Sequence, residues 1–336
     1  MPPGNTKPEF KIAVVGVGQV GAAVAYALIL GSVACELLLV DVKVDLRDGQ
    51  VLDLLDVAYG RNSQTRVRAA TFQEASQCDI VVITVGSKYV QGKRSDGRKL
   101  ITCCPEDASS REHVGQPGIE KLYHSIAVVG SAVKAMKPFR SDTILLLVSN
   151  PVDLVTTFAQ GLSGLPRSQV LGSGTFLDSV RLRGLLADKT GVAANSIDLY
   201  VLGVHGNSQV VAWSTATIGG VPIDKSLPPS ILNRAELANE CKHRSERIIQ
   251  AKGTTIFGIG SIVSSICSSI LFDKRNVRPV SHFQQEFGCC FSMPVILGRE
   301  GIIRTIEMPL NSAEKANIAE SAKTLKGTID RINGDQ

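Results

Sequence analysis

The chain has 336 residues, of which 44% are hydrophobic and 20% are charged. This share of apolar residues can fill a sizeable core, so the composition excludes a disordered chain. The formal net charge of +5 comes without a clustered basic excess; this excludes a dedicated nucleic-acid binder and suits small anionic ligands. No apolar run approaches the length of a membrane span, and the polar start predicts no secretory leader.

The eight cysteines are spread along the chain, and none of them forms a C-x-x-C pair. A disulfide framework or a zinc site normally needs closer and more regular spacing. We therefore expect free thiols, a cytoplasmic location and no metal site.

The first half alternates short apolar runs with helical patterns. The runs lack the alternation of a half-exposed strand, which favours parallel strands buried on both faces. Repeated strand–helix units predict an α/β fold with a Rossmann-type doubly wound parallel sheet. The expected strands are residues 11–15, 36–40, 80–85 and 143–148, and the expected helices are residues 22–30, 50–58 and 126–136.

The pattern changes near residue 173, where we expect an α+β domain to begin. Short strands at residues 199–204, 210–215 and 293–297 are predicted to form a different sheet. Long helical patterns cover residues 178–189, 234–251 and 312–331. The predicted domains are a cofactor-binding domain over residues 8–172 and a substrate or catalytic domain over residues 173–333.

One segment, residues 92–118, fits neither pattern. It contains five Lys or Arg residues and four Asp or Glu residues, with no helical or strand period and no long apolar run. A loop of this length inside a compact domain is uncommon and is usually functional or disordered.

A glycine-rich motif directly follows the first expected strand and opens an Ala-rich helix. The match to G-x-G-x-x-G consists of Gly16, Val17, Gly18, Gln19, Val20 and Gly21. In this context the glycines allow a tight turn and let a pyrophosphate approach the helix N-terminus. Asp41 ends the second strand, about 20 residues beyond the motif, where a carboxylate binds a ribose diol and repels a 2′-phosphate. The sequence therefore predicts NAD, in preference to NADP.

A possible acid–base group lies in the second half. His205 follows an apolar strand, and Asp178 and Arg181 are three residues apart at the start of a helix. An Asp can orient an imidazole and stabilise its cation, and an Arg can bind a substrate carboxylate through two hydrogen bonds. From the spacing alone, an ordinary i, i+3 ion pair is the simpler interpretation of Asp178 and Arg181.

Taken together, these motifs resemble the L-lactate dehydrogenases of the lactate/malate dehydrogenase superfamily. The order and spacing of the matching segments agree nearly from end to end, outside residues 92–118. The segments are KIAVVGVGQVG, ELLLVD, DIVVITVG, ILLLVSNPVD, VLGSGTFLDSVRLR, VLGVHGNS, AKGTTIFGIG and SMPVILGREGI.

The resemblance implies a role for individual residues. His205 matches the proton donor and acceptor, Asp178 the acid that orients it, and Arg181 the residue that pairs with the substrate carboxylate. Further matches are Asn150 at the substrate and nicotinamide, Thr255 in the substrate pocket, and Thr84, Val85, Gly86 and Lys88 along the cofactor. The implied reaction interconverts L-lactate and pyruvate with NAD, in a homotetramer that acts on a small 2-hydroxy or 2-oxo acid.

The chain departs from the family at the mobile loop after the third buried strand. The family's specificity position falls on Val90 and its catalytic Arg position on Ser95, so neither matches. Candidates for a replacement Arg are Arg94, Arg98 and Arg111, and about twenty residues are additional.

Two interpretations of this segment remain open. It is either a real lid or a translated non-coding stretch, and its missing pattern favours the second. Malate dehydrogenase is an alternative activity because Val90 does not distinguish the two substrates. A second alternative is an NAD-binding protein whose catalysis is impaired by the altered loop.

Overall fold

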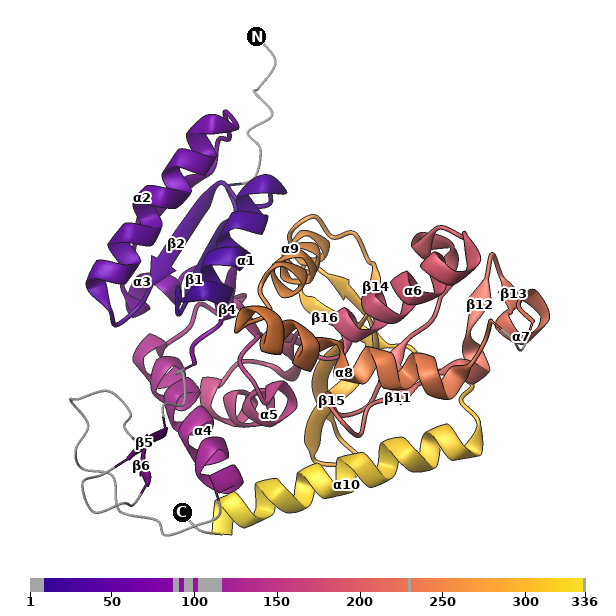
Figure 1. Ribbon diagram of the computed structural model, residues 1–336. Coiled ribbons are helices and arrows are strands. Elements are labelled where there is room, and N and C mark those ends of the chain that lie inside the picture. The colour runs from indigo at the N-terminus through magenta and orange to yellow at the C-terminus, as the bar shows by residue number, and fades with distance from the viewer. Residues whose placement is uncertain (1–8, 87–90, 94–98, 102–116, 229–230, 335–336) are drawn as a thin grey trace.

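The computed structural model describes residues 9–86, 91–93, 99–101, 117–228 and 231–334. A large sheet runs through the molecule with helices on both faces, and the long helix α10 (Ser312–Gly334) lies along one edge (Figure 1). Among the helices in these ranges, none is long and apolar enough to cross a membrane.

The large sheet has nine strands in the described residues, in the order β16-β15-β14-β8-β7-β4-β1-β2-β3. The strands that lie from β3 to β8 in this order pair in parallel. Continuous apolar runs predicted four of them, at residues 11–15, 36–40, 80–85 and 143–148. The strands β3 and β8 were not predicted. These parallel strands are β1 (Lys11–Val15), β2 (Glu36–Val40), β3 (Arg66–Ala69), β4 (Ile80–Ile83), β7 (Ile144–Leu147) and β8 (Val170–Gly172). The expected doubly wound α/β architecture is confirmed.

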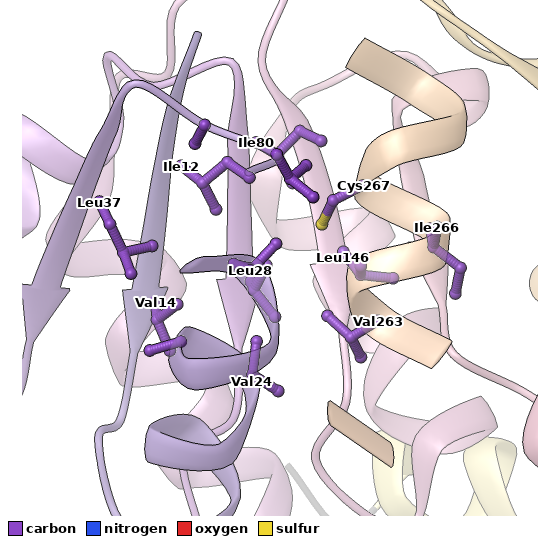
Figure 2. Packing of buried hydrophobic residues seen from close by; sticks show 14 of the residues in the cluster. Ile12, Val14, Val24, Leu28, Leu37, Ile80, Leu146, Val263, Ile266 and Cys267 are labelled. Atoms are coloured by element: carbon purple, nitrogen blue, oxygen red, sulfur yellow. The ribbon is translucent and has the colours of Figure 1, made fainter. Parts of the chain in front are cut away.

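Helices cover the two faces of this sheet, which buries alternate strand side chains in two separate cores. One core packs α1 (Gln19–Leu30), α2 (Val44–Gly60) and α9 (Phe257–Leu271) against the sheet. Figure 2 shows part of it, with Val24 and Leu28 of α1 and Val263 of α9 directed toward the strands. The other core lies under α3 (Phe72–Ala75), α4 (Pro117–Met136) and α5 (Val152–Ser163).

The second half of the chain contributes three antiparallel strands to the same large sheet. They are β14 (Val277–Gln284), β15 (Cys289–Gly298) and β16 (Gly301–Thr305), and β14 joins β8 through the pair Ser281 and Gly172. The prediction that residues 293–297 belong to a different sheet is therefore wrong. Sequence pattern indicated a strand there, but it did not indicate the neighbour with which the strand pairs.

Smaller elements complete the second half. The strands predicted at 199–204 and 210–215 are shorter in the structure, where they form the antiparallel pair β10 (Val201–Leu202) and β11 (Val210–Val211). Residues 213–215 form a 3-10 helix instead, η3 (Trp213–Thr215). A second small sheet joins β9 (Ile197–Asp198), β12 (Thr217–Ile218) and β13 (Val221–Pro222). The remaining helices are α6 (Phe176–Thr190), α7 (Ile223–Ser226), α8 (Arg234–Lys252), η1 (Arg167–Gln169) and η2 (Ala194–Ser196).

Within residues 92–118, the described part includes the short antiparallel pair β5 (Gln91–Lys93) and β6 (Lys99–Ile101) and the start of α4. The pair forms a two-stranded sheet of its own. The two interpretations of this segment remain predictions.

Asp79 joins three segments that are distant in sequence. Its Oδ2 accepts the backbone N–H of Lys11 at 2.8 Å, and its Oδ1 accepts Nη2 of Arg140 at 2.9 Å and Nη2 of Arg299 at 2.6 Å. Burial raises the pKa of the Asp79 carboxyl. The three donors together lower it by more than burial raises it, so the net pKa lies below its usual value. The ionised carboxylate therefore stabilises the fold.

We expect Asp79→Asn to lower the free energy of unfolding by about 1.5–3 kcal/mol at neutral pH, because charge-assisted hydrogen bonds are lost. Since the folded-state pKa is depressed, the difference from wild type should be full above the ordinary carboxyl pKa and should vanish as the pH falls through the folded value. Urea unfolding of both proteins at several pH values measures this difference in the free energy of unfolding. Asp142→Asn, which removes an exposed partner of Arg140, is the control; equal losses in both variants would contradict this role.

Candidate active site

The glycine-rich loop lies where the strand order reverses, between β1 and β4, which is the usual ligand crevice of such sheets. Gly16 has φ +89°, and a Cβ on it would lie 2.8 Å from the Cα of Val85. A Cβ on Gly21 would lie 2.1 Å from the carbonyl oxygen of Gly16. Both positions therefore require glycine for the close approach of loop, strand and helix.

Gly18 differs from the other two glycines because it faces open space. A Cβ built there would meet no heavy atom within 4 Å. Gly18 is also the N-cap of α1, and as a glycine it has no side chain that could cap the amides at this helix start. The loop thus offers both the room and the backbone N–H donors that a pyrophosphate requires.

Asp41 holds the loop from the end of β2. Its Oδ2 accepts the backbone N–H of Val17 at 2.8 Å, and its Oδ1 accepts that of Lys43 at 2.9 Å. Thr84, beyond β4, donates its hydroxyl to the Gly16 carbonyl at 2.6 Å. The cofactor residues predicted on three separate segments therefore meet at one edge of the sheet, in an arrangement that fits a dinucleotide.

The predicted acid–base group is also brought together, around the carboxylate of Asp178. Nδ1 of His205 lies 2.8 Å from Asp178 Oδ2, and Nη1 of Arg181 lies 3.5 Å from Asp178 Oδ1. Asp178 is 2% exposed, so water screens both interactions weakly. The i, i+3 ion pair expected from the spacing is present, and its carboxylate also contacts the His205 ring.

Backbone contacts explain how β10 and α6 bring these groups together. Ser179, next to Asp178 on α6, accepts the backbone N–H of Val201 on its hydroxyl at 2.8 Å. The following Gly203 forms a bridge with Ser292 of β15 through N–H···O bonds of 2.9 and 3.0 Å. Gly203 has φ +80°, which turns the chain so that His205 faces α6.

The electrostatics of the cluster favour a protonated histidine. Burial lowers the pKa of His205, but the hydrogen bond and charge of Asp178 and the charge of Asp153 outweigh it, so the net pKa is raised. Arg181 acts in the opposite direction on His205. Burial lowers the pKa of Arg181 itself, against the charge of Asp178.

Two side chains that sequence reasoning missed contact this cluster. Ser245 of α8 accepts a hydrogen bond from Nη1 of Arg181 on its hydroxyl at 2.6 Å. Asp153 of α5 accepts the backbone N–H of His205 on Oδ2 at 2.6 Å. Asp153 is the last residue of the ILLLVSNPVD segment, so its position in a family motif could have indicated a role in the site. Nothing in the sequence pattern of α8 distinguishes Ser245.

The other predicted site residues are less directly connected. Asn150 is exposed between β7 and α5, and Thr255 is half-buried between α8 and α9. In the part of the chain that the structure describes, neither side chain hydrogen-bonds to His205, Asp178 or Arg181. Gly86 follows Val85 beyond β4. The residues that lie outside the described ranges are Lys88, Val90, Arg94, Ser95, Arg98 and Arg111.

Across the described ranges, no three His, Cys, Asp or Glu side chains gather in a way that could hold a metal ion. The chemistry available to the described cluster is proton transfer by an imidazole and anion binding by a guanidinium.

Comparison with known proteins identifies the family to which both halves of the chain are similar. A family model described as the lactate/malate dehydrogenase NAD-binding domain matches residues 10–100. A second, described as the lactate/malate dehydrogenase α/β C-terminal domain, matches residues 175–335. The first match ends inside the atypical segment 92–118.

Individual relatives agree over nearly the whole length. The chain is 38% identical over 316 residues to an L-lactate dehydrogenase A of Rhizopus oryzae, covering 94% of this chain and 91% of the relative. It is 34% identical to an L-lactate dehydrogenase 3 of Bacillus cereus, covering 96% and 98%. The crystal structure of a minor L-lactate dehydrogenase from Enterococcus mundtii, in a ligands-bound form, superposes with a TM-score of 0.84 at 31% identity, covering 97% and 99%. The chain therefore belongs to the lactate/malate dehydrogenase family.

Proposed function

We propose that this protein is an NAD-dependent L-lactate dehydrogenase that interconverts L-lactate and pyruvate. One observation carries the chemical part of the proposal: Asp178 holds His205 on one carboxylate oxygen and faces Arg181 with the other. An imidazole that can donate a proton therefore lies near a guanidinium that can bind an anion, and this supports the reduction of a 2-oxo acid. The full-length similarity to L-lactate dehydrogenases supports the choice of substrate.

The chain's own residues define how the proton is transferred. Because Nδ1 of His205 faces Asp178, Nε2 is the ring atom that can give its proton to the substrate carbonyl oxygen. Asp178 stabilises the imidazolium before the transfer. In the reverse direction the neutral Nε2 accepts the hydroxyl proton of lactate.

Substrate and cofactor orientation come from the surrounding residues. Arg181 is fixed by Ser245 and keeps guanidinium N–H groups for the substrate carboxylate. The glycine loop and Asp41 would hold the dinucleotide, with Thr84, Val85, Gly86 and Lys88 along it and Asn150 between the nicotinamide and the substrate. Thr255 is assigned to the substrate pocket. When bound, NADH supplies the hydride to C2 of the 2-oxo acid.

The direct test follows NADH absorbance with the full chain and either pyruvate or oxaloacetate. We expect turnover with pyruvate and weak turnover with oxaloacetate. Preference for oxaloacetate would instead assign malate dehydrogenase activity. Tight NADH binding without turnover of either substrate would contradict the enzymatic proposal.

Asp41 provides a test of the cofactor assignment. We expect Asp41→Ser to weaken NADH binding by about 10- to 100-fold, since hydrogen bonds to a charged group are worth about 1.5–3 kcal/mol. NADPH binding should weaken less, because the 2′-phosphate no longer meets a carboxylate. Fluorescence titration with both cofactors measures the ratio. Asp45→Asn, a nearby exposed acid on α2, is the control; an unchanged ratio in Asp41→Ser would contradict the assignment.

We also propose a homotetramer in the cytoplasm. Helix α2 leaves Val44, Leu52 and Tyr59 exposed by 53%, 67% and 72%, which is unusual for a helix that faces only water. The free thiols among the described residues suit a reducing compartment. Light scattering during gel filtration measures the assembly.

A further inference from the structure

Asp153 is a buried acid in the first turn of α5 that the proposed mechanism does not use. An acid at this point of a helix commonly interacts with its own helix N-terminus. Here the carboxylate reaches across the chain, and its Oδ2 accepts the backbone N–H of His205, 52 residues further on, at 2.6 Å. The side chain thus fixes the backbone of the residue that carries the proton.

The surroundings of Asp153 are unfavourable for a charge. The residue is 3% exposed, and its Oδ1 is buried without a hydrogen-bond partner among the described residues. Burial raises the pKa of Asp153 to about 6, although the Ser281 hydroxyl and the His205 N–H lower it. A carboxylate in such a place is costly and needs a compensating role.

The groups around Asp153 and His205 show which charge can offset the cost of burying the Asp153 carboxylate. Asp178 and Arg181 of α6 face His205 with opposite charges. On the β15 side, Cys289 and Cys290 lie near Asp153, and burial raises the pKa of both thiols, so they are uncharged near neutral pH. Among these groups, the cation that can stabilise the Asp153 carboxylate directly is the imidazolium of His205.

We propose that Asp153 is a positioning residue for His205, which fixes its backbone by a hydrogen bond and adds a second negative charge that stabilises its imidazolium. His205 then lies between two carboxylates, Asp178 at the ring and Asp153 at the main chain. Above about pH 6 the Asp153 carboxyl is ionised, so its charge is present where His205 loses its proton. The inference rests on the proposed function, because it assigns a role in the same proton transfer.

Asp153→Asn tests the charge and keeps the hydrogen bond. The amide oxygen can still accept the His205 N–H, and the new NH₂ can donate toward the Ser281 hydroxyl, which lies close enough to lower the pKa of the wild-type carboxyl. We expect a normal Tm and normal NADH binding. The high-pH limb of kcat/KM for pyruvate reduction should move down by about one pH unit, as expected for loss of a nearby opposite charge. A limb that coincides with that of wild type would overturn the proposal.

Asp153→Ala tests the hydrogen bond as well. It removes the acceptor and leaves the His205 N–H unsatisfied, so kcat should fall roughly tenfold at all pH values, beyond the pH shift. Glu314→Gln is the matched control, because Glu314 is a carboxylate with 7% exposure that also accepts a backbone N–H, from Ser214 at 3.0 Å. A shift of the pH profile in the control equal to that in Asp153→Asn would also overturn the proposal.

NMR titration of the histidine ring signals separates this inference from the proposed function. It needs no turnover, and His205→Gln identifies the signal of His205. A lower ring pKa in Asp153→Asn supports the role of Asp153 even if wild type does not reduce pyruvate, in which case only the proposed activity fails. An unchanged ring pKa overturns the inference even if pyruvate is reduced normally.

Discussion

Replacing His205 with glutamine is expected to lower kcat for pyruvate reduction by about 10²–10⁴-fold, the usual contribution of a positioned acid–base group. Glutamine keeps a polar side chain in contact with Asp178, but it cannot deliver a proton from the position of Nε2. NADH binding should be unchanged, because His205 lies on a different segment from the glycine loop. Stopped-flow kinetics and NADH fluorescence titration measure the two effects separately.

His243→Gln is the matched control for this variant, since His243 is an exposed histidine on α8. The control should keep wild-type activity. In wild type, the raised pKa of His205 keeps the imidazolium to higher pH than usual, so reduction declines only as the pH rises through the folded value, while lactate oxidation increases. If His205→Gln kept more than about a tenth of wild-type kcat, another group would have to donate the proton.

Replacing Arg181 with leucine is expected to lower kcat/KM for pyruvate by roughly 30-fold to several thousand-fold, since loss of one partner of a buried charge pair costs about 2–5 kcal/mol. Arg181 is 9% exposed, so bulk water cannot readily replace its proposed contact with the substrate carboxylate. The change also leaves Asp178 without its second cation. Steady-state kinetics with pyruvate give the loss, and most of it should appear in KM.

Two further variants identify what the guanidinium supplies. Arg181→Lys keeps the charge but loses the planar pair of donors, so it should recover only part of the activity. Arg183→Lys, on the same helix with its Nε bonded to the Ser179 carbonyl, is the control and should behave as wild type. Complete recovery by lysine would mean that charge alone, without two-point binding, attracts the substrate.

The local parts of this site could be predicted from sequence because each depends on neighbouring residues. The glycine loop and Asp41 follow predictable strands, and the Asp178–Arg181 pair follows from helical spacing. The contact between His205 and Asp178 crosses 27 residues, so only the family resemblance indicated it. Asp153 was missed because an acid at the start of a helix is ordinarily explained by the helix itself.

In the large sheet, too, local features could be predicted from sequence, whereas the pairing of distant segments could not. The parallel core was predicted because strands buried on both faces are continuously apolar. The β14 strand was not predicted: its sequence, VRPVSHFQ, mixes polar residues with a proline that pairs with Pro294 of β15. Without β14, the pattern of β15 could not indicate that the large sheet continues into the second half of the chain.

The shared carboxylate of Asp178 makes substrate binding and proton uptake parts of one equilibrium. In the free site the charge of Arg181 acts to lower the pKa of His205. In the proposed mechanism a bound substrate carboxylate neutralises that charge, so the imidazole should hold its proton more strongly once the 2-oxo acid has bound. By thermodynamic reciprocity, the 2-oxo acid binds more weakly as the pH rises, whereas the hydroxy acid, whose hydroxyl must give its proton to Nε2, requires the neutral imidazole. The direction of net flux through the site is thereby tied to the proton concentration of its surroundings.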